Sequence, residues 1–364
     1  MRKRKIIFAY VVLHRAPSRP SSAQRTFTDR YFRSIAAGMD AIRDTQTRNS
    51  RWSRDAVVDR RGAPAVARPT ERDIEIFKLL VRFRYLPSDY IHAFVGGSEK
   101  ALSHRLGLLS RKPNLYLARP HQQRERADAN YRRLIYEIDE GGRRLLREQG
   151  LPFLPKSYHH NFTHELMVAQ IMASIELGVR ADDKVRLITW PEILAHQTTP
   201  TATRDSATPA TIRVSYELRG ERRSDEITAD ARPFGIERTT DGKRSYLFFP
   251  GIEADCGTEP INASDTDRSS IGKKFAAYLT IARDGIHRSH FGFPNFFVPF
   301  ITTSELRMRS MMQLAERLTE GRGSKILLFK TFPSFTSVER TPASGHMLTE
   351  PWLRVGAEPF RLIG

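Results

Sequence analysis

Side chains that could bind a metal ion and a phosphate gather between residues 226 and 278. Asp230 belongs to one short apolar segment, and Glu253 and Asp255 belong to the next. Side chains two positions apart on a strand point to the same face, so Glu253 and Asp255 can point together toward whatever Asp230 faces. A helical segment with Lys273 and Lys274 follows. Clustered carboxylates beside an amine suit a divalent-cation site for phosphodiester hydrolysis, although acids also end strands where the chain returns to water.

The elements that must position these acids are those of a mixed sheet with flanking helices. Apolar alternation and turn residues predict strands, and the Thr240-Asp241-Gly242 turn predicts a hairpin. Helical spacing of apolar residues predicts a helix that ends at Gly178, one that ends before Gly285, and one that Ser304 caps. The predicted strands cover residues 185–190, 212–218, 226–231, 234–237, 246–252, 296–302 and 325–329.

The N-terminal half has the pattern of a different fold. Thr70 and Asp73 form a capping pattern before a helix, and Gly96-Gly97 end a second helix. A third helix opens at Ser98, and strands follow at 115–118 and 134–138 before a closing helix from Glu140. Three helices and a two-stranded ribbon predict a winged helix-turn-helix. The fold class is therefore α/β (α+β), with a winged helix followed by a mixed-sheet domain.

In a winged helix the third helix enters the major groove of DNA and the wing contacts phosphates. A solvated charged face on a protein-binding winged helix is the alternative, but the local charge favours double-stranded DNA. The candidate DNA-binding residues on the helix and in the wing are Lys100, Ser103, His104, Arg105, Arg111, Arg124, Arg126, Arg132 and Arg133.

The distribution of charge supports a polyanion partner. The net charge is +18, of which residues 1–70 carry +11 and residues 71–150 carry +5. A basic half joined to a near-neutral half is typical of a nucleic-acid-binding module attached to a second domain. Cys256 is the only cysteine, so disulfides and thiolate zinc clusters are excluded, and a cytoplasmic location is expected. No apolar segment is long enough to span a membrane.

Composition shifts divide the 364 residues into four parts. Residues 1–67 are read as a basic arm, for which an extension without function is the alternative. The winged-helix domain covers 68–150. The mixed-sheet domain covers 158–335, after a proline-rich joint, and 336–364 is a C-terminal tail.

The order of the acids and elements in the second domain resembles the PD-(D/E)xK nuclease-like fold. That resemblance implies that Asp230 and Glu253 hold Mg²⁺, which Mn²⁺ can replace. Ala229 replaces the motif proline, and Asp255 stands where the motif has lysine. Asp255 then assists at the metal, and Lys273 or Lys274 supplies the missing positive charge.

The run from Glu253 to Glu259, followed by Lys274 and Tyr278, resembles the replication-relaxation family over about residues 68–335. Members come from plasmids, phages and other mobile elements. The resemblance implies a DNA-associated role in replication or transfer, with replication or conjugation proteins as possible partners. Glu165 matches a helix position that contributes an outer metal contact in some nucleases of the fold; an ordinary surface acid is the alternative. His160 and His164 are one helical turn apart, but packing, capping or phosphate contact is favoured over zinc binding.

Three functional hypotheses follow from these observations. The first is a DNA-binding protein of a mobile element with a Mg²⁺-dependent endonuclease site. The second is a non-catalytic DNA-binding regulator or accessory factor with a degenerate nuclease fold. The third makes the second domain a protein-docking scaffold.

Overall fold

The computed structural model describes residues 52–59, 61–125, 133–151, 161–257, 260–261, 270–332 and 343–363. The chain divides into two units, Met1–Asp55 and Ala56–Gly364, and the second unit contains the elements discussed below. Most of the expected basic arm, and Arg126 and Arg132 of the expected wing, lie outside the described residues.

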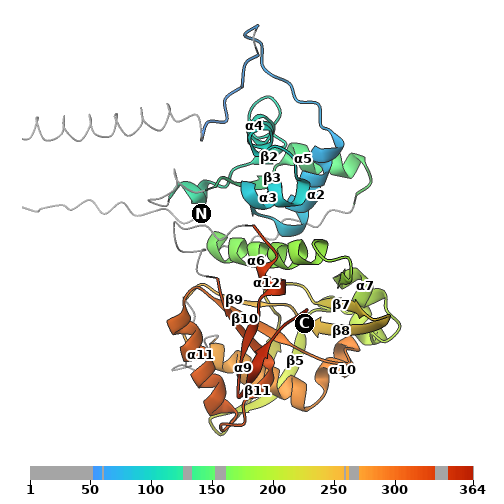
Figure 1. The fold of residues 1–364 in the computed structure, drawn as a ribbon, viewed down its shortest axis with the longest axis vertical. Helices are drawn as coiled ribbons and strands as arrows, with labels where there is room; N and C mark the ends of the chain where they lie inside the picture. The colour runs from blue at the N-terminus through green and yellow to red at the C-terminus, as the bar shows by residue number, and fades with distance from the viewer. Residues whose placement is uncertain are drawn as a thin grey trace, which may run out of the picture. The chain divides into compact units, whose positions relative to one another are not determined.

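The N-terminal lobe, residues 67–151, is built from helices around a small sheet (Figure 1). Thr70 and Asp73 form a reciprocal capping box at the start of the first helix, as the sequence predicts. Ser98 caps the helix that was expected to contact DNA. The sheet has the order β1-β3-β2, because Leu86–Pro87 adds a strand that the sequence pattern does not indicate. The elements are α2 (Glu71–Phe83), β1 (Leu86–Pro87), α3 (Ser88–Val95), α4 (Glu99–Leu109), β2 (Leu117–Ala118), the short helix η1 (His121–Arg124), β3 (Ile135–Ile138) and α5 (Glu140–Glu148).

The C-terminal lobe, residues 161–363, contains three sheets and makes the chain a mixed α/β protein. Its five-stranded sheet has the order β13-β12-β11-β10-β9, with β9, β10 and β11 parallel. A three-stranded sheet, β4-β7-β8, and a two-stranded sheet, β5-β6, stand beside it. The strands are β4 (Val185–Ile188), β5 (Ile212–Leu218), β6 (Glu221–Ile227), β7 (Phe234–Thr240), β8 (Lys243–Phe249), β9 (Glu253–Asp255), β10 (Val298–Thr302), β11 (Ser324–Thr331), β12 (Trp352–Val355) and β13 (Ala357–Phe360).

The helices of this lobe cover both faces of the five-stranded sheet (Figure 1). Successive strand residues point to opposite faces, so Phe300 and Phe329 pack into one hydrophobic core with α9 and α11. Ile301 and Leu328 pack into a second core with α6 and α12. The helices are α6 (Phe162–Arg180), α7 (Trp190–Ala195), α8 (Thr201–Arg204), α9 (Ile271–Arg283), α10 (Ile286–Phe291), α11 (Glu305–Leu318) and α12 (His346–Thr349).

Two expectations about this lobe are wrong. The helix that begins at Phe162 does not end at Gly178 but continues to Arg180. Gly178 is required there for close packing, because a Cβ on it would lie 2.7 Å from Leu348 Cβ. Residues 346–360 do not form a tail, since they supply α12, β12 and β13. Trp352 of β12 is fully buried in the core shared with α6.

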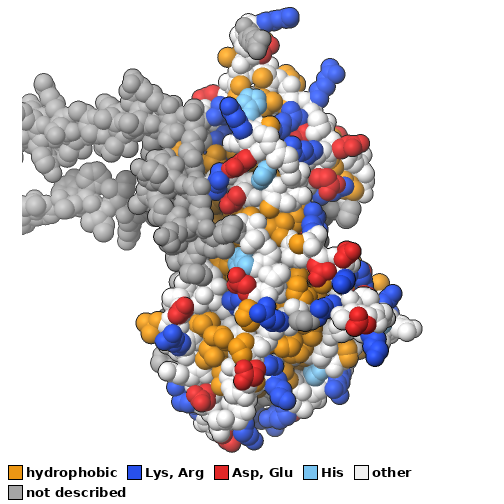
Figure 2. Space-filling view, in the orientation of Figure 1, with side chains coloured by type: hydrophobic (Ala, Val, Ile, Leu, Met, Phe, Trp, Pro, Cys, Tyr) orange, Lys and Arg blue, Asp and Glu red, His pale blue; other side chains and the backbone are white. Residues whose placement is uncertain are grey.

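Among the described residues, no helix is both long enough and apolar enough to cross a bilayer. Acidic and basic side chains are interspersed over the visible surface of the C-terminal lobe, as its near-neutral sequence predicts (Figure 2).

Candidate functional site: a carboxylate pair at the sheet edge

The predicted acidic cluster lies at the β9 edge of the five-stranded sheet. Residues 228–233 connect β6 to β7, so Asp230 is not on a strand, contrary to expectation. Its segment instead runs beside β9, where the Asp230 N–H donates to the carbonyl of Ile252 (2.9 Å). Ala254 N–H of β9 donates to Asp230 Oδ2 (2.7 Å). These two bonds bring Asp230 next to Glu253, although 22 residues separate them in the sequence.

Gly251 makes this close approach possible. Its φ of +140° is a backbone conformation that other residues rarely adopt. A Cβ at this position would lie 2.2 Å from the Ala231 carbonyl oxygen and 2.7 Å from Ala229 Cβ. A glycine at position 251, directly before β9, is thus the sequence signal that this segment passes close to the backbone of residues 229–231.

Asp230 is held as a carboxylate by a partner from α6. His164 Nε2 lies 3.2 Å from Asp230 Oδ2, and its side chain is mostly buried. Burial opposes ionisation of Asp230, but the hydrogen bond from His164 and the charge of Lys274 outweigh it and hold the Asp230 pKa below its usual value. The hydrogen bond to Asp230 raises the pKa of His164 above its usual value. His164 therefore belongs to the site, which the spacing of the histidines alone did not indicate.

Glu253 is the most deeply buried acid of the site, with 2% of its surface exposed. Two donors from α9 contact it: Lys274 Nζ lies 2.8 Å from Oε2, and the Tyr278 hydroxyl donates to Oε1. Burial raises the pKa of Glu253 to about 7, against the lowering effect of Lys274 and with a further increase from Asp230. Lys274 thus acts electrostatically on both carboxylates. Lys274 is thus the lysine of this helix that lies beside the two acids, and its role at a phosphate stays a prediction.

Asp255 shares a face of β9 with Glu253, as expected, but it has other partners. Arg307 of α11 forms a two-armed ion pair with the carboxylate, with Nη2 2.7 Å from Oδ1. The Thr302 hydroxyl donates to Oδ2 (2.7 Å). The expectation that Asp255 joins Asp230 and Glu253 is therefore not met in this geometry. The two-residue spacing placed Asp255 on the same strand face as Glu253. The local sequence could not show that Arg307, far along the chain on α11, would pair with Asp255.

The two remaining candidate site residues are Lys273 and Glu165. The ion pair with Glu253 is made by Lys274, while the N–H of Lys273 is capped by Ser270 Oγ (3.3 Å). Glu165 forms an ion pair with Arg84 of the N-terminal lobe (3.1 Å). Glu165 therefore connects the two lobes in this structure.

The fit of these residues to a divalent cation rests on two carboxylates. Within the described ranges, no three His, Cys, Asp or Glu side chains converge to hold a metal ion. Mg²⁺ is commonly bound by one or two carboxylates, with water and substrate oxygens completing its shell. Asp230 and Glu253 supply two such carboxylates, and Lys274 is the cation already paired with Glu253. Such a cation would polarise a phosphoryl oxygen and acidify a bound water.

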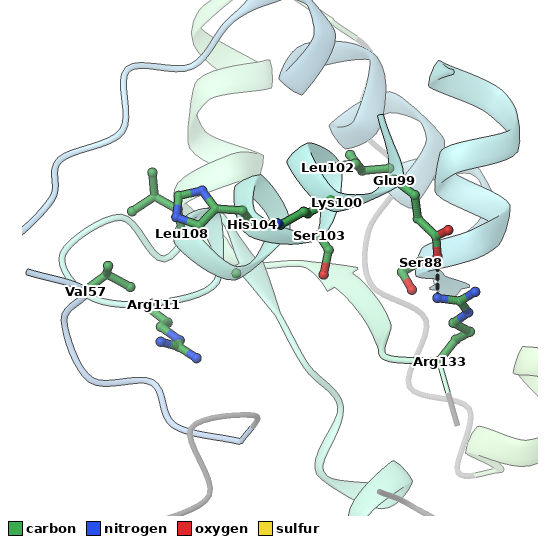
Figure 3. A pocket seen from close by; sticks show the side chains of 11 residues that line it. Val57, Ser88, Glu99, Lys100, Leu102, Ser103, His104, Leu108, Arg111 and Arg133 are labelled. Carbon is green, nitrogen blue, oxygen red and sulfur yellow. Dashed lines mark ion pairs between the residues drawn. The ribbon is translucent and has the colours of Figure 1, made fainter. Parts of the chain in front are cut away.

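The structure places the described DNA-binding candidates in three locations. Lys100, Ser103, His104, Arg111 and Arg133 line one pocket along α4 (Figure 3). Arg105 faces α2, where it pairs with Asp73 (2.6 Å) and donates to the Arg68 carbonyl (2.7 Å). Its charge stabilises the α2 cap, so the geometry gives it a structural role. Arg124 lies in η1.

The fold and the edge site define a mixed α/β protein in which a small helical lobe is joined to a sheet that carries a charged carboxylate pair. Residues 77–295 match the model of the replication-relaxation family, and the chain belongs to this family. Membership suggests a role in the replication or transfer of a plasmid or other mobile element, with DNA and replication-related partners. Comparisons with curated proteins and with solved structures gave no match.

Proposed function

We propose that this protein binds double-stranded DNA through its N-terminal lobe and cleaves a phosphodiester bond at the Asp230–Glu253–Lys274 site with Mg²⁺. In this role the N-terminal lobe acts as a winged helix, and α4 enters the major groove of the DNA. The element order of this lobe supports that assignment, as does the excess of basic residues before residue 150.

The convergence of Asp230, Glu253 and Lys274 carries the proposal. These residues come from a loop, an edge strand and a helix. Burying a carboxylate such as Glu253 costs free energy that an apolar side chain would not cost. Two carboxylates and a lysine at one sheet edge are also what the PD-(D/E)xK resemblance implies, with the lysine moved from the strand to the next helix.

Each residue has a distinct task in the proposed reaction. Asp230 and Glu253 would hold the metal ion, and His164 would orient Asp230 through its hydrogen bond. Tyr278 would orient Glu253 in the same way. Lys274 would stabilise negative charge on the scissile phosphate.

Plasmid cleavage with matched variants tests the enzymatic part. Supercoiled plasmid is incubated with Mg²⁺ and wild-type protein, Asp230→Asn or Glu226→Gln. Asp230→Asn keeps an acceptor for Ala254 N–H, and Glu226 is an exposed acid on β6 that serves as the control. We expect Asp230→Asn to slow nicking on the order of 100-fold, the size typical of removing one electrostatic group of a site, because it removes one of the two carboxylates that would hold the metal ion. Equal nicking by wild type and Asp230→Asn, or none by wild type, would remove the nuclease proposal.

A non-catalytic DNA-binding role is the second candidate, and one observation favours it. Lys274 and His164 already balance the charges of Glu253 and Asp230, and Asp255 is paired with Arg307. This role predicts DNA affinity that is unchanged by EDTA and by Glu253→Gln. In both roles affinity falls steeply with salt, because counterions are released from the DNA. Affinity measurements with and without EDTA, beside the nicking assay, separate the two roles.

A further inference from the structure

A short hairpin lies beside α4, formed by residues that the sequence assigned to the basic arm. Val58 and Pro64 form a β-bridge, and Ala65 N–H donates to the Val57 carbonyl (2.7 Å). Asp59 organises the turn, since its Oδ1 accepts from the N–H groups of Arg61 (2.8 Å) and Ala63 (3.0 Å). This hairpin, described at residues 57–59 and 61–65, has Arg61 exposed in its turn.

Asn114 fastens the hairpin to the end of α4. Its Nδ2 donates to the carbonyls of Ala65 (3.0 Å) and Leu108 (3.1 Å), and its Oδ1 accepts from Ala67 N–H (2.7 Å). One side chain therefore ties α4 to the segment that leaves the hairpin. This arrangement fixes the position of the hairpin relative to the helix.

A groove of about 580 Å³ runs along α4, and Val57 is the hairpin residue that lines it. Lys100, Ser103 and His104 project from α4 along it, Val57 and Arg111 stand at one end, and Glu99 and Arg133 stand at the other (Figure 3). Leu102 and Leu108 supply apolar lining. The exposed face of α4 is therefore one wall of a groove, and the hairpin borders its C-terminal half.

The charges around this groove select an anionic occupant. Glu99 is the one acid that lines it, and Glu99 forms an ion pair with Arg133 (Figure 3). Asp59 directs its Oδ1 to N–H groups within the turn. Lys100 and Arg111 also line the groove, and Arg61 is exposed in the turn of the hairpin. Regularly spaced phosphates of a duplex complement such a rim better than a single small anion does.

We infer that this hairpin, at residues 57–59 and 61–65, is a second DNA-contacting arm, which contacts the phosphate backbone beside the DNA major groove that α4 enters. The inference rests on the proposed DNA-binding function and adds the partner contacts of that surface. The N-terminal part of a recognition helix contacts base edges, which assigns Lys100, Ser103 and His104 to the bases. Arg111 and Arg61, at the end bordered by the hairpin, contact phosphates.

Salt-dependent binding of the full chain to a labelled 30-base-pair duplex tests this inference, with fluorescence anisotropy as the readout. Arg61→Gln removes the tip charge, and Asp59→Ala removes the acceptor that holds the turn. Arg322→Gln is the control, because Arg322 is also an exposed arginine in a turn next to a glycine of positive φ. We expect Arg61→Gln to weaken binding several-fold and to reduce the slope of log K against log salt by about 0.9, the value for one phosphate contact.

The expected result for Asp59→Ala is a similar loss of affinity, and for Arg322→Gln an unchanged affinity and slope. If wild type binds the duplex and both hairpin variants keep its affinity and slope, the hairpin does not contact DNA and the inference is overturned. If wild type itself does not bind, the proposed DNA-binding function fails instead. Circular dichroism spectra of the variants verify that the fold is intact.

Discussion

Among single residues, Glu253 has the most unusual environment. Its carboxylate is almost fully buried between Lys274 and Tyr278, and burial raises its pKa from 4.5 to about 7. A folded-state pKa above the unfolded value means that the folded protein binds more protons between these two values. The free energy of unfolding contributed by Glu253 therefore falls as pH rises from about 4.5 through 7, and is constant above that range.

This sign gives a testable pH dependence. Relative to Glu253→Gln, wild type should lose roughly 2–3 kcal/mol of unfolding free energy between pH 5 and pH 8, at 1.36 kcal/mol per pKa unit. Urea denaturation of both proteins in EDTA buffer measures the difference, and the variant corrects for His164 and Asp230, whose pKa values also shift. A difference between the two proteins that stays constant over this pH range would contradict the prediction.

The elements that the sequence predicted well are those with strong local signals. The helix of Lys274 begins at its Ser270 cap, and the hairpin between β7 and β8 turns at Asp241-Gly242, where both residues have positive φ. Local signals also placed Glu253 and Asp255 on one strand face. They could not show that Asp230 lies in a loop or that Arg307 forms an ion pair with Asp255, because these features depend on contacts between distant segments.

Gly178 of α6 is a further feature that depends on a distant segment, because it packs closely against α12. In α6 it faces α12, where an added Cβ would lie 2.9 Å from Leu348 Cδ2 and 3.0 Å from the Gly345 carbonyl oxygen. Gly178→Ala should destabilise the protein by about 1–3 kcal/mol through overpacking, despite the gain of up to about 1 kcal/mol from better helix propensity. Gly107 is the matched control, since it lies within α4 and nothing stands within 4 Å of an added Cβ.

Urea midpoints of the two variants give the comparison. Gly107→Ala should be neutral or stabilising by about 0.5–1 kcal/mol. If Gly178→Ala proved as stable as Gly107→Ala, the α6–α12 contact would not be the reason for a glycine inside α6.

Within residues 56–364, α6 belongs to the cores of both lobes. Ala169 and Ala173 belong to the N-terminal core, where α6 contacts α2 and α3, and Leu166 and Ile171 belong to the core of the C-terminal sheets. Arg82 of α2 also pairs with Glu176 of α6 (2.8 Å). Because α6 contributes side chains to both cores, unfolding of one lobe would also remove part of the core of the other. The two lobes should therefore unfold together, although their sequence patterns predict separate domains.

Pulsed thiol labelling in urea can follow each lobe separately. Cys256 reports on the C-terminal lobe, and burial raises the pKa of its thiol to about 11, which suppresses its reaction in the folded state at pH 8. A Ser110→Cys, Cys256→Ser variant places the thiol in the N-terminal lobe, where Ser110 is 1% exposed. Both thiols should become reactive at one urea concentration.

Ala173→Asp, which buries a charge in the shared core, should lower both midpoints together. Labelling of the thiol at position 110 at a clearly lower urea concentration than Cys256 would instead mean that the N-terminal lobe unfolds alone, and that α6 holds it only weakly to the sheet.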